Sequence, residues 1–126
     1  MSAYTLKNIL ETDDDAAAYG MGDTLEAHFL RRQLGCERTG VSLQRIKPGQ
    51  RMFGHTHKTD EEIYVVLSGS GDALLGDERH DLKPMDALRV APGTLRAFAS
   101  GPDGLELLAF GTHHEDDAVQ AEDVWS

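Results

Sequence analysis

From Pro48 onward, turn-forming residues interrupt the chain so often that no typical helix fits between them. The interruptions are Pro48-Gly49, Ser68-Gly69-Ser70-Gly71, Gly76-Asp77, Lys83-Pro84, Pro92-Gly93 and Gly101-Pro102-Asp103-Gly104. The runs between them are short, and several are rich in β-branched or aliphatic residues, such as Ile63-Tyr64-Val65-Val66-Leu67. Short strands at this spacing predict an all-β protein, either a sandwich or a barrel.

The pattern predicts nine strands, joined mostly by the turns named above. They are expected at Leu25–Arg32, Val41–Ile46, Arg51–His57, Glu62–Ser68, Asp72–Leu75, Arg79–Leu82, Asp86–Val90, Leu95–Ala99 and Leu105–Phe110. The segment Thr12–Gly22 favours one helical turn through Ala16, Ala17 and Ala18, which Gly20 and Gly22 cut short.

The length of the chain leaves room for one core only. It has 126 residues, 40% of them hydrophobic and 27% charged, which is typical of one globular domain. We therefore expect a single domain over residues 1–126, with a barrel core at about 25–112 and acidic, flexible ends.

Acidic side chains outnumber basic ones by 22 to 12, and the net charge of −10 disfavours nucleic acid and anionic membrane surfaces as partners. Cys36 is the only cysteine, so an intrachain disulfide is impossible. The segment Met1–Asp15 has no basic stretch followed by an apolar one, and no run approaches the ~20 apolar residues of a membrane span. These features predict a cytoplasmic protein.

Two histidines and a glutamate form the strongest chemical pattern. Alternation along the expected strand Arg51–His57 places His55 and His57 on one face, from which both imidazoles can reach one metal ion. Glu62 opens the next strand, and an antiparallel return would bring its carboxylate beside them. The expected metal ligands are therefore His55, His57 and Glu62.

In these residues the chain resembles the cupin superfamily. The first cupin motif is matched in register by Gly49, His55, His57, Glu62 and Gly69. The second motif is present only in part, as Met85-Asp86 and Pro92-Gly93-Thr94-Leu95-Arg96, with Ser100 beyond it, and Arg96 stands where the family has its third histidine.

The resemblance covers Val41 to Phe110 and implies a double-stranded β-helix jelly-roll barrel with a ligand pocket inside. It also implies a divalent metal ion, iron, manganese, zinc or nickel, on His55, His57 and Glu62, and a homodimer. An open sheet edge near the N-terminal strands is a second reason to expect pairing between copies.

Arg96 allows two interpretations, because a guanidinium has no lone pair with which to bind a metal. In one, a metal lies on the three ligands and Arg96 faces it, as a fork for the carboxylate or phosphate of a substrate. In the other, Arg96 pairs with Glu62 in a metal-free pocket. The metal interpretation predicts a small anionic ligand, with Arg96, Tyr64 and Gln44 as the residues that contact it.

Two further residues are open at the level of sequence. His28 is the histidine that we expect to replace the missing ligand if any does. Trp125, the only tryptophan, either packs on the barrel of its own chain, packs on a second subunit, or belongs to a disordered end.

Three functions are compatible with these residues. The first is a mononuclear metal enzyme, such as an oxygenase or isomerase, that acts on a small anionic metabolite. The second is a binding or sensing module without catalysis, and the third is a purely structural homodimeric barrel. The cupin fold does not decide between them.

Overall fold

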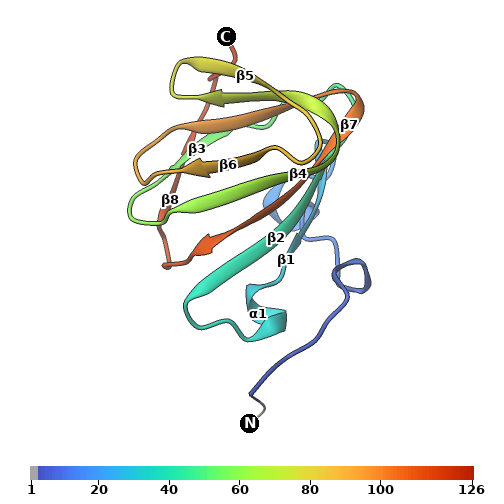
Figure 1. Cartoon of the computed structure of the whole chain (residues 1–126), viewed down its shortest axis with the longest axis vertical. Coiled ribbons are helices and arrows are strands. Elements are labelled where there is room, and N and C mark those ends of the chain that lie inside the picture. The colour runs from blue at the N-terminus through green and yellow to red at the C-terminus, as the bar shows by residue number, and fades with distance from the viewer. Residues whose placement is uncertain (1–2) are drawn as a thin grey trace.

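Eight strands form one antiparallel sheet with an apolar core. The sheet curls round on itself (Figure 1). The computed structural model describes residues 3–126. Its strands are β1 Leu25–Phe29, β2 Thr39–Ile46, β3 Gly54–His57, β4 Glu62–Leu75, β5 Glu78–Leu82, β6 Ala87–Val90, β7 Arg96–Thr112 and β8 Ala118–Ala121. The helical pieces are the 3-10 turns Ile9–Glu11 and Ala17–Tyr19 and the helix α1, Arg31–Leu34. The all-β jelly-roll prediction is confirmed.

Strands β4 and β7 are the two long strands that connect the sheet. They pair with each other, and most of the other strands pair with one of them. The first half of β4 pairs with β6 and with the end of β7, and its second half pairs with β5 and with the start of β7. The other edge of β7 carries β2 and β3. Each long strand therefore contributes to both ends of the barrel.

The predicted turns at residues 68–71 and 101–104 are wrong, because both segments continue as strand with irregular pairing. The register of β4 against β7 shifts between Val66 and Ser68 and again between Gly69 and Gly71. The backbones lie so close here that a Cβ on Gly71 would stand 2.1 Å from the carbonyl oxygen of Ala99. These glycines permit a β-bulge rather than a reversal of the chain.

Three other boundaries differ from prediction. Strand β1 ends at Phe29 rather than at residue 32, since α1 follows and closes at Gly35, whose φ of 70° suits a helix C-terminus. Strand β3 begins only at Gly54, although Arg51 forms an isolated bridge with Ala99. Strand β8 lies beyond the expected core of 25–112 and was not predicted.

Strand β8 pairs with β3 over its whole length, and the residues after it also pack on the barrel. Nε1 of Trp125 donates to the carbonyl oxygen of Met52 at 2.7 Å, and the guanidinium groups of Arg51 and Arg79 lie 5.5 and 5.1 Å from its ring. Of the alternatives for Trp125, the structure shows packing on its own chain.

The core fills the inside of the curled sheet and is made of inward-facing side chains. Tyr64 and Phe98 meet there with ring centroids 4.7 Å apart. Other fully buried members are Leu25, Ala27, Ile46, Val66, Leu105, Leu107 and Ala109. Within residues 3–126, no helix has the length and apolar character that crossing a membrane requires.

Candidate functional site

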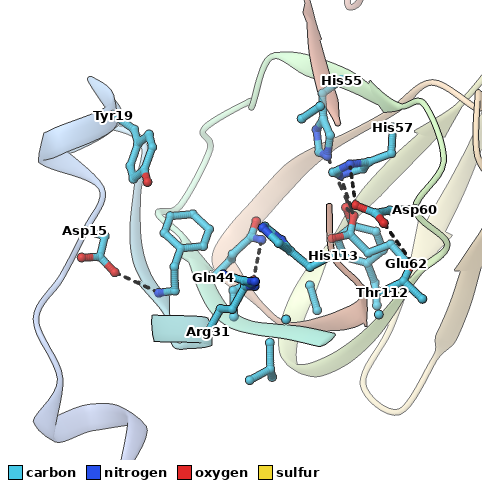
Figure 2. Close-up of a pocket in the computed structure, with 18 of the residues that line it drawn as sticks. Asp15, Tyr19, Arg31, Gln44, His55, His57, Asp60, Glu62, Thr112 and His113 are labelled. Atoms are coloured by element: carbon cyan, nitrogen blue, oxygen red, sulfur yellow. Dashed lines mark hydrogen bonds and ion pairs between the residues drawn. The ribbon is translucent and has the colours of Figure 1, made fainter. Parts of the chain in front are cut away.

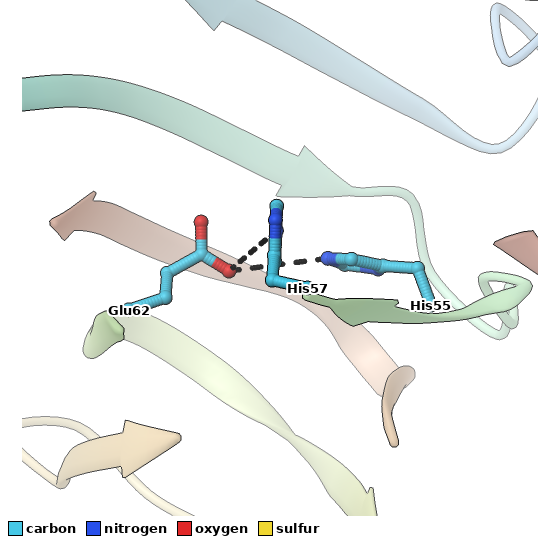
Figure 3. A group of neighbouring side chains, drawn as sticks. All are labelled: His55, His57 and Glu62. Atoms are coloured by element: carbon cyan, nitrogen blue, oxygen red, sulfur yellow. Dashed lines mark ion pairs between the residues drawn. The ribbon is translucent and has the colours of Figure 1, made fainter. Parts of the chain in front are cut away.

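His55, His57 and Glu62 converge inside the barrel, as alternation along the strands predicted (Figure 3). The two imidazoles project from β3 with ring centroids 5.0 Å apart. Glu62 is the first residue of β4, and its Oε1 lies 3.6 Å from Nε2 of His57 and 3.9 Å from Nε2 of His55. The polar connection 58–61 turns the chain back and brings the carboxylate to the rings.

The three donor atoms lie within 4.8 Å of one another and would have to move closer to bind one metal ion. Two atoms that bind one ion at ~2.1 Å are about 3.0 to 3.4 Å apart in octahedral or tetrahedral geometry. The observed separations of 3.6 and 3.9 Å exceed this by a few tenths of an ångström. Two imidazoles and a carboxylate suit a divalent transition metal and leave further positions for a ligand. Their role as metal ligands stays a prediction.

Electrostatics favour the metal-binding states of His57 and Glu62. Burial lowers the pKa of the His57 imidazole below its ordinary value despite the charge of Glu62, which favours the neutral ring. Burial by itself would raise the pKa of the Glu62 carboxyl. Hydrogen bonding from His55 and Tyr64 outweighs that effect, and the pKa of Glu62 lies below its ordinary value. Glu62 is therefore an ionised carboxylate.

Arg96 lies behind Glu62 rather than in the open cavity. Its side chain has 0% exposure, Nη1 donates to Oε1 of Glu62 at 3.0 Å, and Nη2 donates to the carbonyl oxygen of Thr94 at 3.2 Å. It does not belong to the residues that line the cavity. In this position Arg96 neutralises and orients Glu62, and its contact with a ligand, as one interpretation required, stays a prediction.

Tyr64 and Gln44 do line the cavity, which has a volume of about 600 Å³ (Figure 2). The Tyr64 hydroxyl donates to Oε1 of Glu62, and burial, with the charge of Glu62, raises the pKa of Tyr64 well above its ordinary value. Nε2 of Gln44 donates to Oγ of Ser42 at 3.1 Å, so the amide oxygen is free for another partner. Tyr64 thus contacts Glu62 and Gln44 contacts Ser42, and the role of both as ligand contacts stays a prediction.

Several residues at the cavity were not found by sequence reasoning. Arg31, Asp60 and His113 line it, and Asp117 lies against His57. Nothing local distinguishes them, because Asp60 lies in a polar connection and Asp117 in an acidic tail. Only the pairing of β8 with β3, across 61 positions between His57 and Ala118, brings Asp117 to the site.

His28 is not a replacement ligand. Its side chain is buried, with Nδ1 3.0 Å from Oγ1 of Thr12 and Nε2 2.6 Å from Oε2 of Glu26. Both ring nitrogens are therefore engaged by neighbours. The described residues form two groups of possible metal ligands, His55-His57-Glu62 and His57-Asp60-Asp117, and His28 belongs to neither.

Comparison with known proteins identifies a relative that matches part of the chain. An uncharacterized protein of Methanocaldococcus jannaschii is 35% identical over 49 residues, which are 39% of this chain and 39% of that protein. The match thus spans well under half of either protein.

Solved structures show the same fold over nearly the whole chain. A cupin protein from Bacteroides fragilis superposes with a TM-score of 0.73 at 24% identity, over 92% of this chain and 89% of that one. Oxalate decarboxylase from Bacillus subtilis superposes with a TM-score of 0.74 at 21% identity, over 92% of this chain but only 32% of the enzyme. At these identities the likeness is one of fold.

The sequence model of the cupin domain matches residues 42–110, more than half of the chain, and this range includes both histidines, Glu62 and Arg96. Strand arrangement, solved relatives and sequence match agree. The chain belongs to the cupin family.

Proposed function

We propose that this protein binds one divalent metal ion on His55, His57 and Glu62 and a small anionic, oxygenated molecule beside it in the barrel cavity. The observation that carries the proposal is the convergence of the three donor atoms, within 4.8 Å of one another, at a cavity large enough for such a molecule. When bound, the metal would supply Lewis-acid polarisation or dioxygen activation, the chemistry of an isomerase or an oxygenase.

The charges around Glu62 support an anionic ligand. Arg96 already balances the negative charge of Glu62, and the two histidines are neutral ligands when they bind metal. A divalent ion would therefore bring about two positive charges that the three ligands and Arg96 leave uncompensated. An anion at the open positions removes this excess.

The cavity itself offers a cation away from the metal group. Arg31 lines the cavity, its side chain is 29% exposed, and its buried Nε has no hydrogen-bond partner among the described residues. Its Nη1 lies 3.8 Å from Oε1 of the exposed Glu115, a contact that an incoming carboxylate can replace. Arg31 lines the cavity, as Arg32 does and Arg96 does not, so its guanidinium is available to a ligand. Gln44 lines the same cavity (Figure 2).

Metal analysis tests the proposal. Protein purified without chelator should carry close to one divalent ion per chain, and His55→Ala should lose most of it. His80→Ala is the matched control, because His80 is 53% exposed and lies in neither ligand group. An ion content far below one per chain that His55→Ala leaves unchanged would refute the metal site.

The alternative is a metal-free binding or sensing module, and one contact favours it. The pair between Arg96 Nη1 and Glu62 Oε1, at 3.0 Å, already satisfies the carboxylate without an ion. Under this alternative a small polar molecule binds in the cavity with equal affinity in chelator and in metal-supplemented buffer. Under the proposed function, chelator abolishes most of that affinity.

A further inference from the structure

A second cluster of carboxylates lies on the far side of His57 from Glu62. Nδ1 of His57 is 3.3 Å from Oδ2 of Asp117 and 4.0 Å from Oδ2 of Asp60, whereas Nε2 faces Glu62. Both aspartates are buried, with exposures of 6% and 3%. The imidazole therefore stands between two acidic groups, one at each ring nitrogen.

The two aspartates accept hydrogen bonds from protein donors on every oxygen. Asp117 accepts from Thr59 N and Oγ1 at 3.0 and 2.6 Å and from Asp60 N at 2.9 Å. Asp60 accepts from Thr112 Oγ1 and from the side chain and backbone of His114, at 2.6 to 3.0 Å. A second metal ion would have to displace several of these bonds. These hydrogen bonds fix the orientation of both carboxylates, and this favours a structural role for the cluster over ion binding.

One polar atom of His57, Nδ1, lacks a hydrogen-bond partner in this arrangement of the described residues. Nδ1 is buried and has no well-aligned hydrogen-bond partner among residues 3–126. Oδ2 of Asp117, at 3.3 Å, is closer to it than any oxygen of Asp60. A small rotation of the ring aligns an Nδ1–H with that oxygen.

We propose that Asp117 is the positioning residue of His57: it accepts the Nδ1–H and so leaves the Nε2 lone pair facing His55 and Glu62. A neutral imidazole carries one proton, and a carboxylate at one nitrogen fixes which nitrogen is free to bind a metal. The consequence for metal binding rests on the proposed function, but the contact between Asp117 and His57 does not.

Backbone pairing fixes Asp117 in this place. Its neighbour Ala118 is the register partner of His57 in the β3–β8 pair. The carbonyl oxygen of Asp117 also accepts from the backbone N–H of Lys58 at 3.0 Å. A rigidly held carboxylate loses little entropy when it orients the ring, which is what a supporting residue of a metal site requires.

The tautomer of His57 tests the inference directly. The ¹⁵N shifts of the imidazole are measured in metal-free protein, above the pKa of the ring, and assigned by comparison with His57→Gln. The wild-type ring should be the Nδ1–H tautomer, and Asp117→Asn should shift it toward Nε2–H, since an amide can donate to Nδ1. A wild-type ring already in the Nε2–H form overturns the proposal without any variant.

Metal affinity is the second measurement, made by titration with Mn²⁺ and Zn²⁺. Asp117→Asn should weaken binding about 10- to 100-fold, the usual effect of losing such a partner. Asp116→Asn is the matched control, because Asp116 is exposed and its φ of 54° is one that asparagine tolerates. It should leave both tautomer and affinity unchanged.

The outcomes separate the inference from the proposed function. If Asp117→Asn changes the tautomer of His57 but the protein binds no metal, the positioning contact is supported and the metal site is refuted. A melting temperature that falls in Asp117→Asn while tautomer and affinity persist shows a merely structural aspartate and overturns the inference. Two ions per chain, one of them lost in Asp117→Asn, would make the cluster a second metal site and also overturn it.

Discussion

Oε1 of Glu62 is the acceptor on which the buried polar side chains of the barrel converge. Tyr64 and Arg96 both donate to it, and the histidines face the same oxygen. Sequence reasoning placed Glu62 and the histidines together, because alternation along strands is strict. It also left open a pair between Arg96 and Glu62, which the structure shows. It could not choose that pair over ligand contact, because the long arginine side chain reaches several places from one backbone position.

Removing Arg96 tests what balances the charge of Glu62. We expect Arg96→Ala to destabilise the metal-free protein by about 3 kcal/mol, since it leaves a largely buried carboxylate without its cation. The figure is at the low end of the usual range because the Glu62 side chain keeps 22% exposure to the cavity. Divalent metal should restore much of the melting temperature by supplying the missing positive charge.

The control for Arg96 is an ion pair at the surface. Arg89 and Glu61 are 3.2 Å apart and more than half exposed, so Arg89→Ala should cost less than about 1 kcal/mol. An equal fall in melting temperature for Arg96→Ala in chelator and in metal-supplemented buffer would speak against the metal site.

At the scale of the element, sequence reasoning predicted the type of structure better than its continuity. Ser68–Gly71 and 101–104 have turn composition, yet both lie inside the long strands β4 and β7. Local composition cannot show that a neighbouring strand pairs on both sides of a glycine. That pairing, with its bulges, is a tertiary effect. For the same reason β8 was not predicted, because this short and mostly exposed strand pairs only with β3 among the described strands.

Gly71→Ala should destabilise the protein by about 3 kcal/mol or more, beyond the usual cost of overpacking a core. The added Cβ would lie 2.1 Å from a backbone oxygen, that of Ala99, and only movement of a strand can relieve the contact. Gly40→Ala is the control, because its Cβ would meet nothing closer than 3.7 Å. Urea unfolding of the two variants measures the difference, and similar midpoints would contradict the close approach.

The segment before β1 is fastened to it through Asp14. Its Oδ1 accepts the N–H of Ala27 at 3.0 Å and that of Ala16 at 2.9 Å, and these bonds hold the pKa of Asp14 below its ordinary value of 3.8. Because the folded state favours the ionised form, this stabilisation is present above the unfolded pKa and is lost as the pH falls through the folded one.

The unfolding free energy of wild type should therefore exceed that of Asp14→Ala by a constant amount at neutral pH. The difference should shrink as the pH falls below 3.8. Urea unfolding at a series of pH values, with the exposed neighbour variant Asp13→Ala as control, measures it. A difference that persists at the lowest pH would show that ionisation of Asp14 is not involved.

For the whole molecule, the expected homodimer needs a different interface from the one that the sequence suggested. The edge of β1 is not open, since Asp14 accepts the N–H of Ala27 and Asp15 that of Phe29. The outer face of the sheet instead carries apolar residues, with Ile63 paired to Phe110 and Val65 to Leu108. Phe110 is 37% exposed, which favours a partner on this face.

We expect sedimentation equilibrium to give about twice the chain mass of 13.8 kDa, and Phe110→Glu to shift the protein toward monomer. Val119→Glu is the control, because Val119 is 47% exposed but lies on β8, away from the pair of Phe110 with Ile63. A single monomeric species at high protein concentration would contradict the dimer.

The three candidate ligands come from one short segment, His55 to Glu62, whereas their supports Arg96 and Asp117 come from distant parts of the chain. Under the proposed function, an unfolded chain would consequently retain a weak metal-binding peptide. By linkage, an ion stabilises the folded protein only by the difference between its affinities for the two states. The rise in melting temperature with metal should thus fall short of that calculated from native affinity alone. The shortfall measures how well the unfolded peptide competes for the ion.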